Sequence, residues 1–330
     1  MSEIKVCVLC AVYNHEKYIR NCLEGILSQR TDFAFEVLVH DDASTDSSAL
    51  VIREFEKKYP DIIKPIYQTE NQYSKGISIT LRYQLPRARG KYISFCEGDD
   101  YWIDKYKLQK QFDYMESHPD CTFCFTNGYI KDMADGGKMR DFIPYNDEDA
   151  AVYKDESCIY TLDDMHRLTF VPTASYFLPA ATMRGLILQL CKTCPTGDLR
   201  LRLYATACGY AYYLRDKTCV YRQNVPNSAM TGWKSYTRRQ RYSHNEKIIE
   251  MIAELDGIFS GKYKAAVERL SYRYIRSLLF CASSFSVFKD DRYRRVYNSL
   301  PLSQKVKCVI KILTPDFVIE WIRKIKKEVK

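Results

Sequence analysis

The chain has 330 residues, of which 46% are hydrophobic and 28% are charged, an ordinary composition for a soluble globular protein. No uninterrupted apolar stretch approaches the roughly 20 residues that span a bilayer, so we do not expect a transmembrane helix. The net charge of +9 is uneven: residues 1–230 carry −3, whereas residues 231–330, with 22 basic and 10 acidic residues, carry +12. This break predicts two domains, 1–230 and a basic region over 231–330, which favours an anionic partner, with a solvated charged surface as the alternative.

Hydrophobic periodicity predicts alternating strands and helices along most of the chain. Nearly continuous apolar runs, such as 35–40 and 91–96, are typical of buried parallel strands. The predicted strands are 4–10, 35–40, 62–67, 91–96, 121–126, 174–178 and 210–214, and the predicted helices are 15–29, 47–58, 76–88, 104–117, 180–190, 197–208, 241–256, 262–282 and 314–329. The alternation predicts an α/β fold with a doubly wound, mostly parallel sheet flanked by helices, followed by a C-terminal helical region.

Two acidic clusters follow directly on two of the predicted strands. The first is Asp41-Asp42-Ala43-Ser44-Thr45-Asp46, and the second is Glu97-Gly98-Asp99-Asp100. Ligands of open α/β sheets bind at the carboxyl ends of the strands, so both clusters can converge on one cleft. Crowded carboxylates repel one another unless a cation lies between them, and hard oxygen ligands suit Mg²⁺ or Mn²⁺ completed by substrate phosphates. By itself, the first cluster could be only a turn and a helix cap.

Glycine-rich phosphate loops are absent from the sequence. Neither G-x-G-x-x-G after the first strand nor G-x-x-x-x-G-K-[ST] occurs, which argues against a dinucleotide-dependent dehydrogenase and a P-loop kinase. A protein that binds a diphosphate without such a loop can use a metal instead, and the acidic clusters offer ligands for one.

The 13 cysteines include three C-x-x-C pairs, which suggest a zinc site. Two of the pairs lie in predicted strands, where residues three apart point to opposite faces, so a shared four-thiolate site is a poor fit. Buried reduced thiols are the better interpretation, and a chain that enters a predicted strand at Ile4 without a signal peptide predicts a cytoplasmic location. The three pairs are Cys7/Cys10, Cys121/Cys124 and Cys191/Cys194.

Several motifs, in their order and spacing, resemble the signature of family 2 glycosyltransferases over roughly residues 4–230. The first group comprises Cys10-Ala11-Val12-Tyr13-Asn14, Ile26-Leu27-Ser28-Gln29 and Val37-Leu38-Val39-His40 with the acidic cluster that follows it. The second comprises Gly90-Lys91-Tyr92-Ile93, Cys96-Glu97-Gly98-Asp99-Asp100-Tyr101-Trp102 and Lys107-Leu108-Gln109-Lys110-Gln111. The resemblance implies a GT-A fold, a nucleotide-sugar donor, a Mn²⁺ or Mg²⁺ cofactor and inversion at the anomeric carbon.

The resemblance also implies roles for individual residues on the donor side. Ala11 and Tyr13 would line the base pocket, and Asp42 would hydrogen-bond the nucleobase, a uracil. Asp99 would contact the ribose or assist at the metal, and Asp100 would bind the metal that bridges the diphosphate. These roles fit the chemistry, because a metal ion stabilises the negative charge that builds on the departing diphosphate.

The acidic motif and the general base need separate interpretation. The motif begins with Glu97 where the family has Asp, which leaves a direct role for Glu97 open. The family's base is an acidic residue that opens a helix, and Thr196-Gly197-Asp198-Leu199 matches this pattern, so Asp198 is the candidate. A single displacement needs such a carboxylate, apart from the metal, to take the proton of the acceptor hydroxyl. The alternative is that Asp198 only caps its helix.

One aromatic residue, Trp102, and one basic residue, Arg222, complete the predicted site. We interpret Trp102 as stacking near the sugar or the acceptor, although a tryptophan more often serves packing. The segment Tyr221-Arg222 with residues 228–233 resembles a part that closes over the donor in some family members, which implies that Arg222 contacts the diphosphate.

Residues 314–330 predict a basic amphipathic helix of the kind that lies on an anionic membrane surface. The alternative is a helix packed on its own domain with solvated lysines. The apolar stripe is Phe317, Val318, Trp321, Ile322, Ile325 and Val329, and the flanking cations are Arg323, Lys324, Lys326, Lys327 and Lys330.

The sequence therefore predicts an inverting, metal-dependent glycosyltransferase of the hexosyltransferase class. It would move a sugar from a UDP-sugar to a hydroxyl of a glycan or lipid-linked acceptor in bacterial surface polysaccharide synthesis. We expect it in the cytoplasm, peripheral at the inner membrane face and without a nucleic-acid partner. Two alternatives stay open: a nucleotidyltransferase-like enzyme, whose Gly- and Arg-rich loop is missing here, and a non-catalytic nucleic-acid-binding protein, whose recognisable motifs are missing.

Overall fold

The structure is a computed structural model that describes residues 3–151, 153, 155–188, 196–225, 232–233 and 235–319. The chain divides into two compact units. The first comprises residues 1–190 and 201–225, and the second comprises residues 191–200 and 226–330. The boundary that the charge distribution predicts, between residues 230 and 231, lies outside the described residues.

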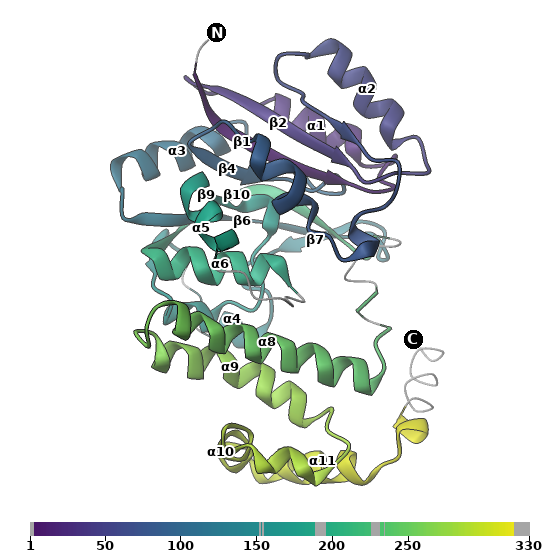
Figure 1. Cartoon of the computed structure of the whole chain (residues 1–330), viewed down its shortest axis with the longest axis vertical. Helices are drawn as coiled ribbons and strands as arrows, with labels where there is room; N and C mark the ends of the chain where they lie inside the picture. Colours follow the sequence, from purple (N-terminus) through teal and green to yellow (C-terminus); the bar gives the residue numbers. More distant parts are fainter. Residues whose placement is uncertain are drawn as a thin grey trace. The chain divides into compact units, whose positions relative to one another are not determined.

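The first unit is built on one sheet, drawn in Figure 1, which contains ten strands in the described part of the chain. Its main path runs in the order β3-β2-β1-β4-β9-β6-β10-β5, with β7 paired to β6 and β8 paired to β10. The strands are β1 (Ile4–Val12), β2 (Ala34–Asp41), β3 (Ile66–Tyr67), β4 (Tyr92–Phe95), β5 (Tyr101–Trp102), β6 (Cys121–Asp132), β7 (Lys138–Asp141), β8 (Cys158–Tyr160), β9 (Phe177–Pro179) and β10 (Tyr210–Gln223).

Parallel pairing holds the part of the sheet that carries the acidic clusters. β1 pairs in parallel with both β2 and β4, and β2 with β3, while β6 and β10 form a second parallel pair. The short β9 joins the two groups by antiparallel pairing to β4 and β6. The predicted α/β fold, with a largely parallel sheet flanked by helices, is confirmed. Because β1, β2 and β4 are parallel, their carboxyl ends share one edge of the sheet.

Helices cover the sheet because each has an apolar face at helical spacing. On one face, the alternate side chains Val6, Val8, Cys10 and Val12 of β1 pack in one cluster with residues of α1, α2 and α3. The helices of this unit are α1 (Ile19–Leu27), α2 (Ser48–Lys58), α3 (Lys107–Ser117), α4 (Asp147–Ala150), α5 (Ala180–Leu188) and α6 (Gly197–Cys208), of which α6 begins in residues assigned to the second unit. Four cysteines of the C-x-x-C pairs are buried free thiols: Cys7, Cys10, Cys121 and Cys124.

Two elements of the first unit differ from their predicted form. β10 continues to Gln223, well beyond the predicted end at 214, because shifts in its register with β6 around Lys217 accommodate the charged interruption Arg215-Asp216-Lys217 as bulges. The predicted helix over 76–88 is instead a π-helical turn, Thr80–Gln84, followed by a 3₁₀ turn, Leu85–Arg87. Pro86 has no N–H to continue an α-helical ladder.

The core beneath the acidic loop contains a buried lysine whose ammonium group donates hydrogen bonds to neutral side chains. Lys107 is 0% exposed, and its Nζ donates to Ser94 Oγ at 3.0 Å and to Gln111 Oε1 at 2.8 Å. The same Nζ lies 4.2 Å from the centre of the Trp102 ring. Burial lowers the pKa of Lys107 to about 8, because the charged form loses its hydration.

This pKa predicts a pH-dependent stability. Between the folded pKa and the usual value for lysine, the unfolded chain binds a proton that the folded chain does not, so the contribution of Lys107 to stability rises with pH. The free energy of unfolding of the native chain, relative to Lys107→Met, is expected to rise by about 2 kcal/mol between about pH 7 and about pH 9.5. Urea unfolding at both pH values measures it, with Lys57→Met as the control at an exposed lysine. Parallel pH curves would show that Lys107 is charged throughout.

In its described part, the second unit contains two long helices that pack against each other and two shorter helices, all labelled in Figure 1. They are α8 (Arg238–Ile258), α9 (Lys264–Leu279), α10 (Asp291–Ser299) and α11 (Leu302–Leu313). A capping box at Thr237 starts α8, since the Thr237 side chain bonds the Gln240 N–H and the Gln240 side chain bonds the Thr237 N–H. The sequence predicted α8 and α9 but not α10 and α11. None of the described helices combines the length and apolar character that crossing a bilayer requires.

Candidate donor and metal site

Two loops at the carboxyl ends of β1 and β2 are tied together by side chain to backbone hydrogen bonds. The Asn14 Oδ1 accepts the Thr45 N–H at 2.8 Å, and the Asn14 N–H donates to Ser44 Oγ at 3.0 Å. The His15 N–H donates to Ser48 Oγ at 2.8 Å. Ser44 and Thr45, in the first acidic cluster, thus connect the loop after β1 to the loop after β2.

Asp46 and Ala43 show that this cluster supports the start of α2 and contains a strained turn. Asp46 accepts the Ser48 N–H at 2.9 Å in the first turn of α2 and the Glu16 N–H at 3.0 Å. Ala43 has φ of 61°, in the left-handed region that non-glycine residues rarely occupy. Such strain persists where surrounding contacts determine the conformation, and it is common at binding sites. Asp46 therefore supports the start of α2, of which Ser47 is the N-cap, but this role does not account for Asp41 and Asp42.

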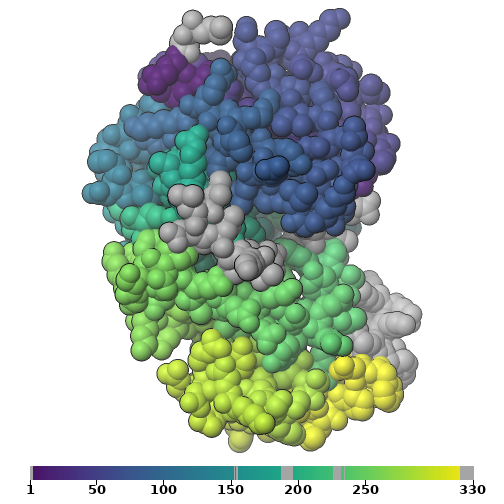
Figure 2. Space-filling view, viewed as in Figure 1, coloured from purple at the N-terminus to yellow at the C-terminus, as the bar shows by residue number. Residues whose placement is uncertain are grey.

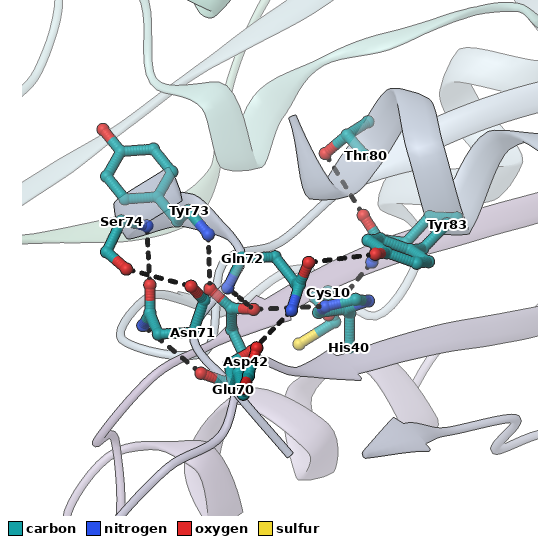
Figure 3. Close-up of polar contacts among 11 residues, drawn as sticks. Cys10, His40, Asp42, Glu70, Asn71, Gln72, Tyr73, Ser74, Thr80 and Tyr83 are labelled. Carbon is teal, nitrogen blue, oxygen red and sulfur yellow. Dashed lines mark hydrogen bonds and ion pairs between the residues drawn. The ribbon is translucent and has the colours of Figure 1, made fainter. Parts of the chain in front are cut away.

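Asp42 organises the loop of residues 70–76, as Figure 3 shows. It is 1% exposed, its Oδ1 accepts the Gln72 N–H at 2.8 Å, and its Oδ2 accepts the Tyr73 N–H at 2.9 Å. His40 lies beside it, with Nε2 3.6 Å from Asp42 Oδ1, and burial lowers the pKa of His40, which favours the neutral imidazole. Asp42 thus already satisfies two backbone amides, and its contact with a nucleobase stays a prediction.

The neighbouring Asp41 is a further candidate, to which the sequence motifs assign no role of its own. It is 3% exposed, and its Oδ1 has no hydrogen-bond partner among the described residues. Burial raises the pKa of Asp41, although hydrogen bonds from Ser44 act in the opposite direction. Its position at the last residue of β2 was a usable signal, because the carboxyl end of a parallel strand faces the ligand.

The two predicted base-pocket residues, Ala11 and Tyr13, lie on either side of Val12, the last residue of β1. Ala11 is half-buried, and its carbonyl accepts the Gly98 N–H at 2.9 Å. Tyr13 is 40% exposed, which leaves its ring accessible to a ligand. The geometry therefore keeps both candidates at the correct edge of the sheet, while their contacts with a base stay predictions.

The acidic loop, Glu97–Asp100, packs closely against the end of β1. A Cβ added to Gly98 would lie 2.9 Å from Val12 Cγ2 and 2.8 Å from His15 Nδ1, so only glycine fits without a shift. Asp99 Oδ2 lies 3.9 Å from His15 Nε2. This close approach brings the acidic loop to the loop that also carries Asn14 and His15.

Asp100 is the most strongly perturbed carboxylate of the site. It is 1% exposed, its Oδ1 accepts the Arg222 backbone N–H at 2.9 Å, and its Oδ2 is buried with no hydrogen-bond partner among the described residues. Burial, and then the charges of Asp99 and Glu97, raise the pKa of Asp100 well above its usual range. A buried carboxylate oxygen next to two further carboxylates fits a divalent cation, which would relieve both the burial cost and the repulsion.

The structure brings Arg222 to the acidic loop, a contact that the sequence did not predict. Its side chain donates to the Asp99 carbonyl at 2.5 Å and to Asn21 Oδ1 at 2.6 Å, and the guanidinium carbon lies 4.4 Å from the centre of the Tyr101 ring. Tyr18 contributes a second ring at 5.1 Å. Arg222 therefore holds the acidic loop in place, and its contact with a diphosphate stays a prediction.

The described residues contain no group of three or more Asp, Glu, His or Cys side chains arranged as a complete metal site. A metal here would take Asp100 and Asp99 as ligands and need substrate oxygens to complete its shell, as Mg²⁺ commonly does. The donor set of carboxylates also suits Mn²⁺. The residues present thus fit a metal that is shared with a diphosphate.

The interpretation of Trp102 as a sugar or acceptor contact is wrong for this structure. Trp102 is 3% exposed and belongs to the core cluster of the sheet. Its Nε1 donates to the Ala174 carbonyl at 2.7 Å, and Lys107 lies over its ring. The indole N–H is bonded and the ring is buried in the core, so Trp102 serves packing, which was the stated alternative.

Asp198 lies in the first turn of α6, where the sequence predicted a helix to open, and it is partly exposed. A carboxylate there interacts favourably with the positive end of the helix dipole. Its role as the general base stays a prediction.

The fold of this chain is of the GT-A type, and solved structures of glycosyltransferases share this fold. Staphylococcus aureus TarS 1–349 in complex with UDP-GlcNAc is 17% identical, with a TM-score of 0.60 over 93% of this chain and 79% of that one. The mannosyltransferase PcManGT of Pyrobaculum calidifontis, in complex with GDP-Man and Mn²⁺, is 19% identical, with a TM-score of 0.55 over 94% and 87%.

Residues 7–167 match the sequence model of Glycosyl transferase family 2, and this part of the chain belongs to that family. An uncharacterized protein of Mycobacterium tuberculosis is 42% identical over 132 residues, which are 40% of this chain and 37% of that protein. TuaG of Bacillus subtilis, named for teichuronic acid biosynthesis, is 33% identical over 138 residues, which are 42% of this chain and 52% of TuaG. The chain therefore matches about half or less of the length of these relatives.

Proposed function

We propose that the protein is a metal-dependent, inverting glycosyltransferase that uses a UDP-sugar. Family membership of residues 7–167 supports the transfer of a sugar, and the fold shared with TarS, which binds UDP-GlcNAc, supports the UDP donor. The observation that carries the proposal is the buried Asp100 with one oxygen held by the Arg222 N–H and the other without a partner among the described residues.

The metal would be held by Asp100 and Asp99, and when bound it would act as a Lewis acid on the leaving diphosphate. The chain's own residues orient this arrangement. Arg222 fixes the acidic loop through the Asp99 carbonyl and the Asp100 carboxylate, and Gly98 lets the loop pack on β1. Keeping these groups in place before the donor binds lowers the reorganisation that transfer requires.

Inversion requires one displacement, in which the acceptor oxygen attacks as the nucleotide leaves. Asp198 is our candidate for the base that takes the acceptor proton, because a carboxylate apart from the metal ligands is needed and Asp198 opens a helix as the family pattern requires.

The acceptor that we propose is a hydroxyl of a glycan or of a lipid-linked intermediate in bacterial surface polysaccharide synthesis. TuaG of Bacillus subtilis supports this class of acceptor, because its name refers to teichuronic acid biosynthesis and its sequence is similar to the first unit. A cytoplasmic enzyme that is peripheral at the inner face of the membrane would meet both a UDP-sugar and such a lipid.

A panel of nucleoside diphosphates and nucleotide-sugars tests the donor class. At a hundred-fold excess over its Kd, UDP with Mn²⁺ is expected to stabilise the protein by about 2.7 kcal/mol, and GDP or ADP by less. Chelating the metal should remove the difference between UDP and the others. Differential scanning fluorimetry measures the shift, and product analysis must find UDP; release of pyrophosphate would instead favour the nucleotidyltransferase alternative.

A further inference from the structure

The α11 ridge is a line of large apolar side chains on the outside of the second unit. It consists of Leu302, Val306, Ile310, Leu313 and Phe317, which are 76%, 49%, 57%, 66% and 76% exposed. The spacing of three or four residues places the four members within α11 on one face of the helix. The opposite face is also apolar, since Cys308 and Ile312 are buried in the core of the second unit. The buried apolar face of α11 therefore packs on the rest of the second unit, whereas the α11 ridge is exposed.

Cations flank the α11 ridge on both sides. At about 100° per residue, Lys305 falls between the buried line and the ridge on one side, whereas Lys307 and Lys311 fall on the other. A groove of about 560 Å³ lies beside Lys307 and Lys311. Among the described residues, its lining contains no Asp or Glu; the lining residues are Arg241, Arg273, Arg276, Ser277, Phe280, Cys281, Gln304, Lys307 and Lys311. Figure 2 shows the yellow-green segment that includes α11 at the surface.

A buried arginine fixes the orientation of α11. Arg238, which is 3% exposed, donates to the carbonyls of Lys311 at 2.7 Å and Thr314 at 2.9 Å at the end of the helix. It also donates to the carbonyls of Ala282 and Cys281 after α9. The positive charge suits the negative end of the α11 dipole. The ridge is thus presented by a helix whose other face and C-terminus are both held.

We propose that the α11 ridge and the adjoining basic groove form a membrane-docking surface, with the ridge inserted among lipids and the groove on anionic headgroups. Exposed apolar patches of this kind mark interaction sites, and a helix with an apolar face between cations is suited to lie in the plane of a membrane interface. The inference deepens the proposed function, on which it rests for a lipid-linked acceptor. It places the surface one helix before the predicted 314–330, of which only 314–319 are described.

Other occupants match the surface less well. A nucleic acid would use the cations but leave five large apolar side chains without a partner. A second copy docked ridge to ridge would bring two sets of groove cations towards each other, and like charges oppose such a contact. An anionic membrane satisfies both parts at once, since it offers acyl chains to the ridge and phosphates to the groove.

Vesicle sedimentation without any nucleotide-sugar tests the proposal. The full chain is expected to bind vesicles of phosphatidylcholine with phosphatidylglycerol at least about ten-fold more tightly than vesicles of phosphatidylcholine alone. The triple variant Leu302→Ser, Ile310→Ser, Leu313→Ser should lose at least about ten-fold of that binding, because the removed side chains no longer enter the lipid. Lys307→Gln should lower binding to the anionic vesicles about five-fold and leave binding to neutral vesicles unchanged.

A matched triple variant controls for the general loss of surface hydrophobicity. Leu50→Ser, Met139→Ser and Ile159→Ser remove side chains that are 63%, 45% and 55% exposed on the first unit, and binding should not change. Equal losses in both triple variants, absence of vesicle binding, a dimer that the ridge variant dissociates, or salt-sensitive RNA binding in place of vesicle binding would each overturn the proposal. Hydrolysis of UDP-sugar in solution is measured in parallel: hydrolysis without vesicle binding refutes only the surface, and vesicle binding without hydrolysis refutes only the proposed function.

Discussion

Asp100→Asn is expected to lower metal-dependent turnover of the UDP-sugar by at least about a hundred-fold. Asparagine keeps the shape of the side chain, and its carbonyl oxygen can still accept the Arg222 N–H that Asp100 accepts at 2.9 Å. What it loses is the negative charge on a buried oxygen that has no hydrogen-bond partner among the described residues. A loss of turnover in a folded protein therefore reports the missing metal ligand. Release of UDP from the donor, measured against Mn²⁺ concentration, follows the effect.

The thermal stability of Asp100→Asn, measured without and with the metal, gives a second test of the metal site. Burial and the charges of Asp99 and Glu97 raise the pKa of Asp100, which means that its ionised form is costly in the metal-free fold. Asp100→Asn should therefore match or exceed the metal-free native chain in thermal stability, yet gain nothing from Mn²⁺ with UDP. The exposed Asp61→Asn is the control and should behave as the native chain. Undiminished turnover, or undiminished stabilisation by Mn²⁺, would remove Asp100 from the metal site.

The part of the fold that positions the site could be predicted from the sequence, because the patterns that indicate it are local. Buried parallel strands are continuous apolar runs, and the acidic residues that follow β2 and β4 are adjacent in sequence, so parallel topology alone brings their ends to one edge. The contacts of Asp42 could not be predicted from the sequence. Its two backbone donors, at Gln72 and Tyr73, come from a loop without periodicity, and nothing in the sequence links that loop to residue 42.

Trp102 and α11 show two further limits of prediction from the sequence. The site motif contains Trp102, but its partners are Lys107 and the Ala174 carbonyl, and the second lies 72 positions away in the chain. A tryptophan that packs beneath a site and one that contacts a ligand can have the same sequence neighbours. α11 escaped prediction because it is apolar on two faces, one buried at Cys308 and Ile312 and one exposed. Two stripes blur the single period on which an amphipathic helix is recognised.

Asp198→Asn is expected to lower transfer at least about a hundred-fold while leaving donor binding intact. Proton transfer by a positioned carboxylate contributes about a hundred- to ten-thousand-fold, and asparagine cannot accept the proton of the acceptor. Binding of UDP with Mn²⁺ should be unchanged, since the base acts on the acceptor. Isothermal titration with UDP and a transfer assay with a sugar acceptor measure the two properties separately.

The same substitution separates the base from the alternative role of Asp198 as a helix cap. Asparagine caps a helix N-terminus about as well as aspartate, so Asp198→Asn should keep the stability of α6, whereas Asp198→Ala would lose roughly 1 kcal/mol if the side chain caps. If Asp198 only caps, the asparagine variant retains transfer and the alanine variant is merely less stable. If asparagine instead weakens UDP binding, Asp198 belongs to the donor side and the base must be another carboxylate. Loss of transfer with full stability and full UDP affinity is the one combination that a catalytic base produces.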